Sequence, residues 1–314
     1  MGTAHGWALA QGGEEVWHVL RGPDRAEASR SVTIDLYDLR QRGRRRGPHD
    51  VTYSASVTRQ VRPEDRFELV VVATKHTEAA EAVRAYRDVA PDAIFLLFTA
   101  NWAGAQEIDA LLPRSRYVWG YPASDGGWAG DRRLMLNLRP EIRLGALPGN
   151  SPTFLSQVRS LFERVGLRPS MKEDILEWLW VHHAINAGTI GGALHAGGIV
   201  QLTRSLQGMA ETMAAVREAL NVVAARGVDL KRYPDAAPYT RWPAWLVPMF
   251  ALAFRYRILH TTYGKRTVAS GHFATNREEM KQFVLDVLLT ARQLRVGAPH
   301  LEAIGTDLQL LVGA

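Results

Sequence analysis

The sequence contains no cysteine among its 314 residues. Disulfide bonds and thiolate nucleophiles are therefore excluded, and His, Asp or Glu would have to supply the ligands of any metal site. No apolar run reaches the roughly 18 residues that a membrane-spanning helix needs. The first twenty residues also lack the cationic start and apolar block of a secretory signal peptide. We accordingly expect a cytoplasmic protein that does not associate with membranes.

Acidic residues are fewer than basic ones, 32 against 38, which gives a formal net charge of +6. Much of the excess lies in the segment RQRGRRRG (40–47). Surfaces that bind nucleic acids usually combine such charges with aromatic side chains, and this segment has none. We interpret it as a solvated loop and do not expect contact with nucleic acid.

The hydrophobic fraction of 46% is large enough for a substantial core, and the length suggests about two domains. Strand and helix patterns alternate in the first part of the chain, which predicts a doubly wound α/β, Rossmann-like sheet. FELVVVAT (67–74) and AIFLLFT (93–99) are uninterrupted apolar runs, typical of strands buried on both faces. We expect helices at 2–10 and 77–90 and further strands at 15–20, 32–39, 50–57, 117–123 and 133–147.

The second part of the chain has apolar residues at every third or fourth position, which predicts an all-α domain. The turn GLRPS (166–170) separates the two patterns, so we expect one domain at 1–168 and a second at 169–314. The helices are predicted at 151–165, 171–195, 204–226, 242–260 and 275–296.

Small and polar residues mark a candidate dinucleotide site in the first domain. Gly2 and Gly6 flank a helix start, where backbone amides and the helix dipole favour a phosphate. A helix start that merely tolerates glycine is the alternative, because the earlier glycines of a G-x-G-x-x-G turn are absent. Arg21 ends the next strand, where an arginine can hold the additional phosphate of NADP. Lys75 and Asn101 follow later strands and are either ligand-contacting or ordinary loop residues.

The order of these residues resembles the ketopantoate reductase family, which joins an NADPH-binding Rossmann domain to a helical domain. The resemblance implies NADPH as cofactor, with Gly2 as the third glycine of the family's turn. It places Arg21, Lys75 and Asn101 on the cofactor side. The family's first strand and first two glycines have no counterpart before Met1. We therefore expect either a start further upstream or a genuine loss, and weak NADPH binding by the chain as written.

The stretch ILEWLWVHHAINAGTIGGAL (175–194) carries the second group of candidates. Trp178, His182 and Asn186 are four residues apart and share one helix face, whereas His183 points elsewhere. Keto reduction needs a proton for the developing alkoxide, and a histidine can supply one near neutral pH. Ordinary cleft or core histidines are the alternative. A metal pair of His182 and His272 lacks a third ligand with recognisable spacing, so no metal is expected.

The corresponding helix of the ketopantoate reductase family has the pattern W-x-K-L-x-x-N, in which the lysine is the general acid and the asparagine contacts substrate. The resemblance therefore puts Trp180 at the tryptophan, His182 in place of the lysine and Asn186 at the asparagine. Trp178, on the helix face of His182 and Asn186, is expected to contact the substrate. The family's second asparagine corresponds to Ile190. Its later serine and glutamate fall near His260 and His272 in 258–276.

These exchanged residues argue against ketopantoate as substrate, because a polar site discriminates by pairing each polar group. We expect an NADPH-dependent reductase of a ketone, aldehyde or imine. The alternative is a cyclase-like or regulatory relative that keeps the fold without the redox role. The apolar helix faces favour a homodimer. The aromatic connector at 233–245 either borders the pocket or packs at an interface.

Overall fold

The computed structural model covers residues 1–314 and describes all of them except 20–30, 131, 243, 271–276 and 311–314. The chain divides into two compact units, Met1–Leu176 and Glu177–Ala314. The first unit is an α/β Rossmann-like body and the second is helical, which confirms the predicted fold class. The change that the sequence places at Arg168 falls at the first residue of a strand, β11.

The first unit is built on a five-stranded sheet with the order β11–β10–β7–β6–β5. Strands β5, β6 and β7 are parallel, β10 runs antiparallel to β7, and β11 is parallel to β10. Helix α3 (Ala79–Tyr86) makes the crossover from β5 to β6, and α4 (Gln106–Asp109) lies between β6 and β7. The strands are β5 (Leu69–Val72), β6 (Ile94–Phe98), β7 (Tyr117–Pro122), β10 (Glu141–Gly145) and β11 (Arg168–Lys172).

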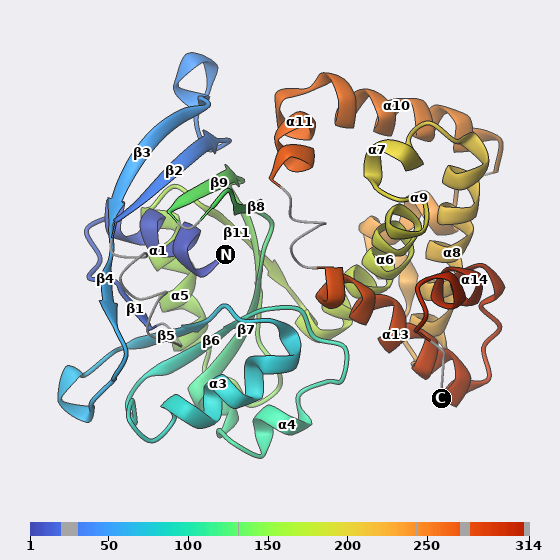
Figure 1. Ribbon diagram of the computed structural model, residues 1–314. Helices are drawn as coiled ribbons and strands as arrows, with labels where there is room; N and C mark the ends of the chain where they lie inside the picture. Colours follow the sequence, from blue (N-terminus) through green and yellow to red (C-terminus); the bar gives the residue numbers. More distant parts are fainter. Residues whose placement is uncertain (20–30, 131, 243, 271–276, 311–314) are drawn as a thin grey trace. The chain divides into compact units, whose positions relative to one another are not determined.

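Two smaller sheets complete this unit (Figure 1). A four-stranded sheet has the order β3–β2–β9–β8, and a parallel pair joins β1 to β4. The tip of the β2–β3 hairpin is the basic segment, where Arg42, Arg44 and Arg45 are exposed as expected for a solvated loop. These strands are β1 (Trp17–Val19), β2 (Ser31–Asp38), β3 (His49–Ser54), β4 (Ser56–Thr58), β8 (Asp125–Trp128) and β9 (Arg133–Leu138).

Arg40 is the exception within the basic segment. Its guanidinium pairs with both carboxylate oxygens of Asp38 and donates to the carbonyl of Val165 at 2.6 Å. The same group lies over the ring of Trp7 at 5.6 Å. The interpretation as a solvated loop is therefore wrong for Arg40, which ties the end of β2 to the helices beside it.

The core of this unit lies where α1 (Gly2–Gln11) and α5 (Pro152–Arg164) meet the strands. Ser151 caps α5 by accepting a hydrogen bond from the amide of Phe154, and Pro152 occupies the first turn, where a missing N–H costs nothing. Trp7 from α1, Leu96 from β6 and Phe162 from α5 are buried together.

Strands β5 and β6 differ in burial, although both were expected to be buried on both faces. All five residues of β6 are buried, which confirms that prediction. In β5 only Val72 is buried, and Leu69–Val71 are half-buried. The reason is position: β5 is the edge strand of the five-stranded sheet, so one side of it has no partner strand among the described residues.

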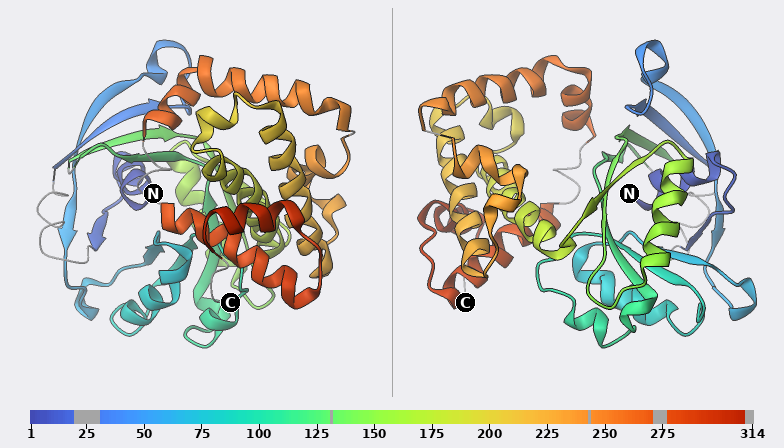
Figure 2. Two further views of the ribbon diagram at one scale, coloured as in Figure 1. Left: turned by 45° about the vertical axis from the view of Figure 1, so that its right-hand side comes forward. Right: turned by 180° about the vertical axis from the view of Figure 1, so that it is seen from behind.

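The second unit consists of helices, and α9, α10, α13 and α14 all pack against α8 (Figure 2). A Cβ atom on Gly188 would lie 2.6 Å from Cα of Val216, so only glycine lets α6 approach α8 this closely. None of the helices in the described ranges combines the length and apolarity needed to cross a membrane. The helices are α6 (Ile175–His195), α7 (Ile199–Leu202), α8 (Leu206–Ala225), α9 (Ala237–Thr240), α10 (Val247–His260), α11 (Thr262–Ala269), α13 (Arg277–Leu294) and α14 (Pro299–Asp307).

The helix expected at 171–195 begins only at Ile175. Residues 168–172 instead form β11, because pairing with β10 satisfies their backbone groups at the sheet edge. The prediction was therefore wrong for the first four residues of the helix.

Candidate active site

The start of α1 lies beside the carboxyl end of β5. A Cβ atom on Gly2 would be 3.5 Å from Cβ of Ala73, the residue that follows this strand. No side chain caps the helix, and its first turn holds no acidic residue in the part of the chain described. The first amides of a helix have no partner within it and face outward together with the positive end of the dipole. This arrangement fits a phosphate group.

Gly6 has a packing role. A Cβ atom there would lie 2.5 Å from Cε1 of His18 on β1, so the glycine makes room for this ring. Nε2 of His18 lies 2.8 Å from the hydroxyl of Tyr53, and burial lowers the pKa of His18. The close approach of α1 to β1 therefore accounts for Gly6 without a ligand, and its predicted cofactor contact stays a prediction.

Lys75 and Asn101 follow β5 and β6, as the sequence indicates. Lys75 is half-exposed, and its Nζ lies 3.8 Å from Oε1 of Glu78. Asn101 is buried and closes its own loop, since it donates to the carbonyl of Gly104 and accepts from the amide of Gly104, both at 2.8 Å. One N–H and one lone pair of its side chain remain for another partner. The hydroxyl of Thr99 joins the two strand ends by donating to the carbonyl of Thr74 at 3.0 Å.

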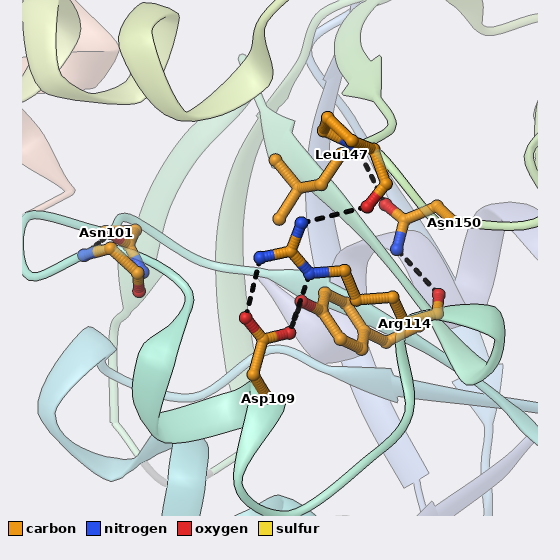
Figure 3. A network of polar contacts seen from close by, with 8 residues as sticks. Asn101, Asp109, Arg114, Leu147 and Asn150 are labelled. Carbon is orange, nitrogen blue, oxygen red and sulfur yellow. Dashed lines mark hydrogen bonds and ion pairs between the residues drawn. The ribbon is translucent and has the colours of Figure 1, made fainter.

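A polar network near β7 contains an acid and a phenol that could be mistaken for proton donors (Figure 3). Arg114 makes two hydrogen bonds to Asp109, at 3.0 and 2.8 Å, and the hydroxyl of Tyr117 donates to the same carboxylate at 2.6 Å. Arg114 therefore holds the pKa of Asp109 below its usual range, and burial raises that of Tyr117. The Arg114 guanidinium also donates to the carbonyl of Pro148, so the network fastens the loop before α5.

In the second unit, α6 presents the predicted face. The rings of Trp178 and His182 are stacked, with centroids 5.0 Å apart and an interplanar angle of 12°. The indole N–H of Trp178 donates to Oδ2 of Asp235 at 2.9 Å. His182 and Asn186 are half-buried on successive turns. The stack fixes the plane of the imidazole and leaves part of it accessible.

The neighbouring side chains of α6 point elsewhere. His183 is fully buried, with Nε2 3.2 Å from Oδ2 of Asp286 and its ring 4.5 Å from that of Phe283. The ring of Trp180 lies under the guanidinium of Arg226 at 3.7 Å. His182, four residues after Trp178, is therefore partly accessible, whereas the adjacent His183 lies in the core.

Other predicted residues are less informative. His260 ends α10 and is exposed, with its ring stacked on that of Tyr256 at 5.4 Å. Arg21 and His272 lie outside the described residues. In the connector, Tyr233 and Tyr239 are buried, whereas Trp242 and Trp245 are exposed, so its rings do not share one role. Among the described residues, no three His, Asp or Glu side chains are placed to hold a metal ion.

Two residues that the sequence did not single out shape these regions. Asp235 anchors Trp178, but 57 residues separate them and no spacing pattern links them. His5 on α1 is buried against the rings of Phe98 and Phe162, and burial lowers its pKa to about 4. In the sequence, only the position of His5 among the apolar residues of the first predicted helix could have indicated that it is buried.

Residues 1–149 match the family model described as Ketopantoate reductase PanE/ApbA. The N-terminal part of the chain is thus similar to a ketopantoate reductase domain. This confirms the resemblance seen in the sequence, and the family comprises NAD(P)-dependent oxidoreductases that act on a ketone.

Similar whole chains show the same fold. A 2-dehydropantoate 2-reductase of Pyrococcus abyssi is 22% identical over 241 residues, which cover 73% of this chain and 72% of the relative. The structure of D-mandelate dehydrogenase with NADH and anilino(oxo)acetate has a TM-score of 0.75 at 14% identity, covering 98% of this chain and 94% of that one. The 2-dehydropantoate 2-reductase of Geobacter metallireducens has a TM-score of 0.69 at 15% identity, with coverages of 98% and 95%.

Proposed function

We propose that this protein is an NADPH-dependent reductase of a ketone, aldehyde or imine other than ketopantoate. The observation that carries the proposal is the half-buried His182, held by its stack on Trp178. The resemblance to the family proposes this residue in place of the catalytic lysine. The comparisons lend no support to the alternative of a cyclase-like or regulatory relative.

The first unit would hold the cofactor. The free amides at the start of α1, beside Gly2, suit its pyrophosphate. Arg21 is proposed to bind the 2′-phosphate, and Lys75 and Asn101 to contact the remainder. When bound, the cofactor supplies a hydride.

In the second unit, His182 is the proposed general acid. As the carbonyl or imine carbon accepts the hydride, the electrons of its double bond move to the oxygen or nitrogen. An N–H of the His182 imidazolium then gives its proton to that atom, leaving neutral imidazole. Asn186, one turn along α6, is proposed to hold the substrate by a hydrogen bond, and His260 and His272 to line its site.

The choice of substrate depends on the residues proposed to replace the family's polar groups. By the resemblance, His182 is proposed to replace a lysine, and Ile190, which is half-buried, to replace an asparagine. A hydroxylated carboxylate would lose a hydrogen-bond partner at Ile190 and leave its own polar group unpaired. We therefore propose a less polar substrate. We also propose that the protein acts as a homodimer, as does the Staphylococcus aureus ketopantoate reductase described as dimeric, with a TM-score of 0.59.

The test compares the two adjacent histidines. We expect His182→Ala to lower kcat for NADPH-dependent reduction by about 10²–10⁴, the usual range for a positioned acid. His183→Ala should instead lower the melting temperature, because it removes the core partner of Asp286. His182→Lys should retain more turnover than His182→Ala.

Turnover is read from the loss of reduced nicotinamide with a panel of ketones, aldehydes and imines, and stability from thermal unfolding. Equal loss of turnover in the two alanine variants, at equal stability, would remove His182 from the proposed mechanism.

A further inference from the structure

Helix α10 is apolar on two opposite faces. Its inner face buries Ala251 and Ile258, while Phe250 and Phe254 pack against a small core with α7 and α8. Figure 1 shows α10, in orange, on the outside of the helical unit. A surface helix normally has one apolar face, and a helix that is apolar all round is usually covered on all sides.

The outer face of α10 and the 3-10 turn before it carry a row of large exposed side chains, which we call the α10 seam: Trp245, Met249, Leu252 and Tyr256. Their exposed fractions are 71, 62, 61 and 64%. Met249, Leu252 and Tyr256 lie on one side of α10, because they are spaced by three and four residues. Trp245 precedes them by four residues, in the 3-10 helix Ala244–Leu246 that leads into α10. Apolar side chains at such spacing form the contact line between paired helices.

We propose that the α10 seam is the interface through which two copies of this chain dimerise. The order of its residues is palindromic: aromatic, aliphatic, aliphatic, aromatic. In an antiparallel pair related by a two-fold axis, Trp245 would therefore meet Tyr256 of the second copy, and Met249 would meet Leu252. A two-fold interface requires such self-complementarity, because both copies present the same surface.

The exposed area agrees with this partner. If a fully buried aromatic side chain contributes about 150–250 Å², the four seam residues expose on the order of 500 Å² together. Each partner in a stable interface buries roughly 800 Å². The seam would thus supply most of one partner's share, with flanking atoms adding the rest.

The charges beside the seam also permit self-association. Helix α10 contains no acidic residue, and Arg255 is exposed next to the seam. In the antiparallel pair, the two copies of Arg255 would lie about 14 Å apart along the axis at a rise of 1.5 Å per residue. This distance exceeds the Debye length of about 8 Å at physiological salt, so their repulsion is largely screened.

This inference rests on the homodimer of the proposed function and assigns its surface. The test compares two leucines of almost equal exposure, Leu252 at 61% and Leu206, at the start of α8, at 60%. By sedimentation velocity at tens of micromolar, the unmodified chain should be dimeric. Leu252→Glu should weaken the dimer at least 100-fold, because it buries unpaired carboxylates at the centre of the interface. Leu206→Glu should remain dimeric.

A second measurement uses the absence of native cysteine. Met249→Cys and Leu252→Cys chains, mixed and oxidised, should form a disulfide-linked dimer in much higher yield than either chain alone. A monomeric unmodified chain, equal dissociation by both glutamate variants, or a monomer that sediments with anionic vesicles would overturn the proposal. The measurement needs neither cofactor nor turnover. A dimer without reductase activity would therefore count against the proposed function and leave the interface standing.

Discussion

At the scale of single residues, chemistry follows from which neighbours a side chain has. His182 and His183 are adjacent and chemically identical, yet one stacks on an indole at an accessible face and the other is enclosed with Asp286 and Phe283. Helix geometry turns successive residues by about 100°, so only one of them can share a face with Trp178. The position of each histidine around the helix axis therefore decides which of the two can be the proposed acid.

We propose that Asp235 positions His182 through Trp178. It accepts the hydrogen bond of Trp178, and Trp178 in turn fixes the plane of His182. We expect Asp235→Ala to lower kcat by roughly 3- to 10-fold, since loss of one hydrogen bond is worth about 1 kcal/mol. Asp235→Asn keeps an acceptor oxygen and should restore most of the activity. Steady-state kinetics of both variants, with thermal unfolding alongside, provide the measurement, and an Asn variant as slow as the Ala variant would contradict the role.

At the scale of elements, helices and strands could be predicted wherever the periodicity of the apolar residues alone determines them. Strands at 94–98 and 117–122 and helices α5, α8 and α13 lie within or close to their predicted ranges. The half-buried state of β5 and the strand at 168–172 were not predictable, because both depend on which strand lies beside them. Tertiary pairing decides such segments, and local pattern does not contain it.

The candidate site divides in the same way. Periodicity finds the shared face of Trp178, His182 and Asn186, since this is a property of one helix. It cannot find Asp235, which reaches Trp178 from a separate segment. Nor does the strand-end position of Asn101 reveal that its amide is engaged by Gly104.

Helix α1 is seated in the core through a neutral histidine, which gives a pH prediction. Nδ1–H of His5 donates to the carbonyl of Met1, and burial, the largest cause, lowers its pKa from 6.5 to about 4. The unfolded chain therefore binds a proton more readily. The contribution of neutral His5 to the free energy of unfolding is fully present above about pH 6.5. It is lost as the pH drops towards 4, by up to about 3 kcal/mol.

Urea unfolding across this pH range tests the prediction. His5→Leu should flatten the dependence, while His49→Leu, at an exposed position on β3, should not. A remaining slope is expected from His18, whose pKa is also lowered by burial. If His5→Leu and the unmodified chain lose stability in parallel between pH 6.5 and 4, the ring is not buried in its neutral form.

At the scale of the whole molecule, the chain consists of two units with separate cores. A ligand that binds the first unit stabilises it by RT ln(1 + [L]/Kd), which at 100 times Kd slows hydrogen exchange through opening of that unit about 100-fold. The two units therefore offer an internal comparison within one experiment.

The final prediction uses this comparison to decide the cofactor. With NADPH at 100 times Kd, hydrogen exchange followed by mass spectrometry should slow at the start of α1, whose first amides have no partner within the helix. Core amides of α8 in the second unit should slow less. NADH at the same concentration should protect the start of α1 only weakly, because it lacks the phosphate proposed to bind Arg21.

Replacement of Arg21 tests the same contact. Arg21→Ala should weaken NADPH binding by roughly 1.5–3 kcal/mol, as expected for a charge-assisted contact, and leave the binding of NADH unchanged. Equal protection by both cofactors in the unmodified chain would exclude Arg21 as the selector, and protection confined to the second unit would exclude α1 as the phosphate site.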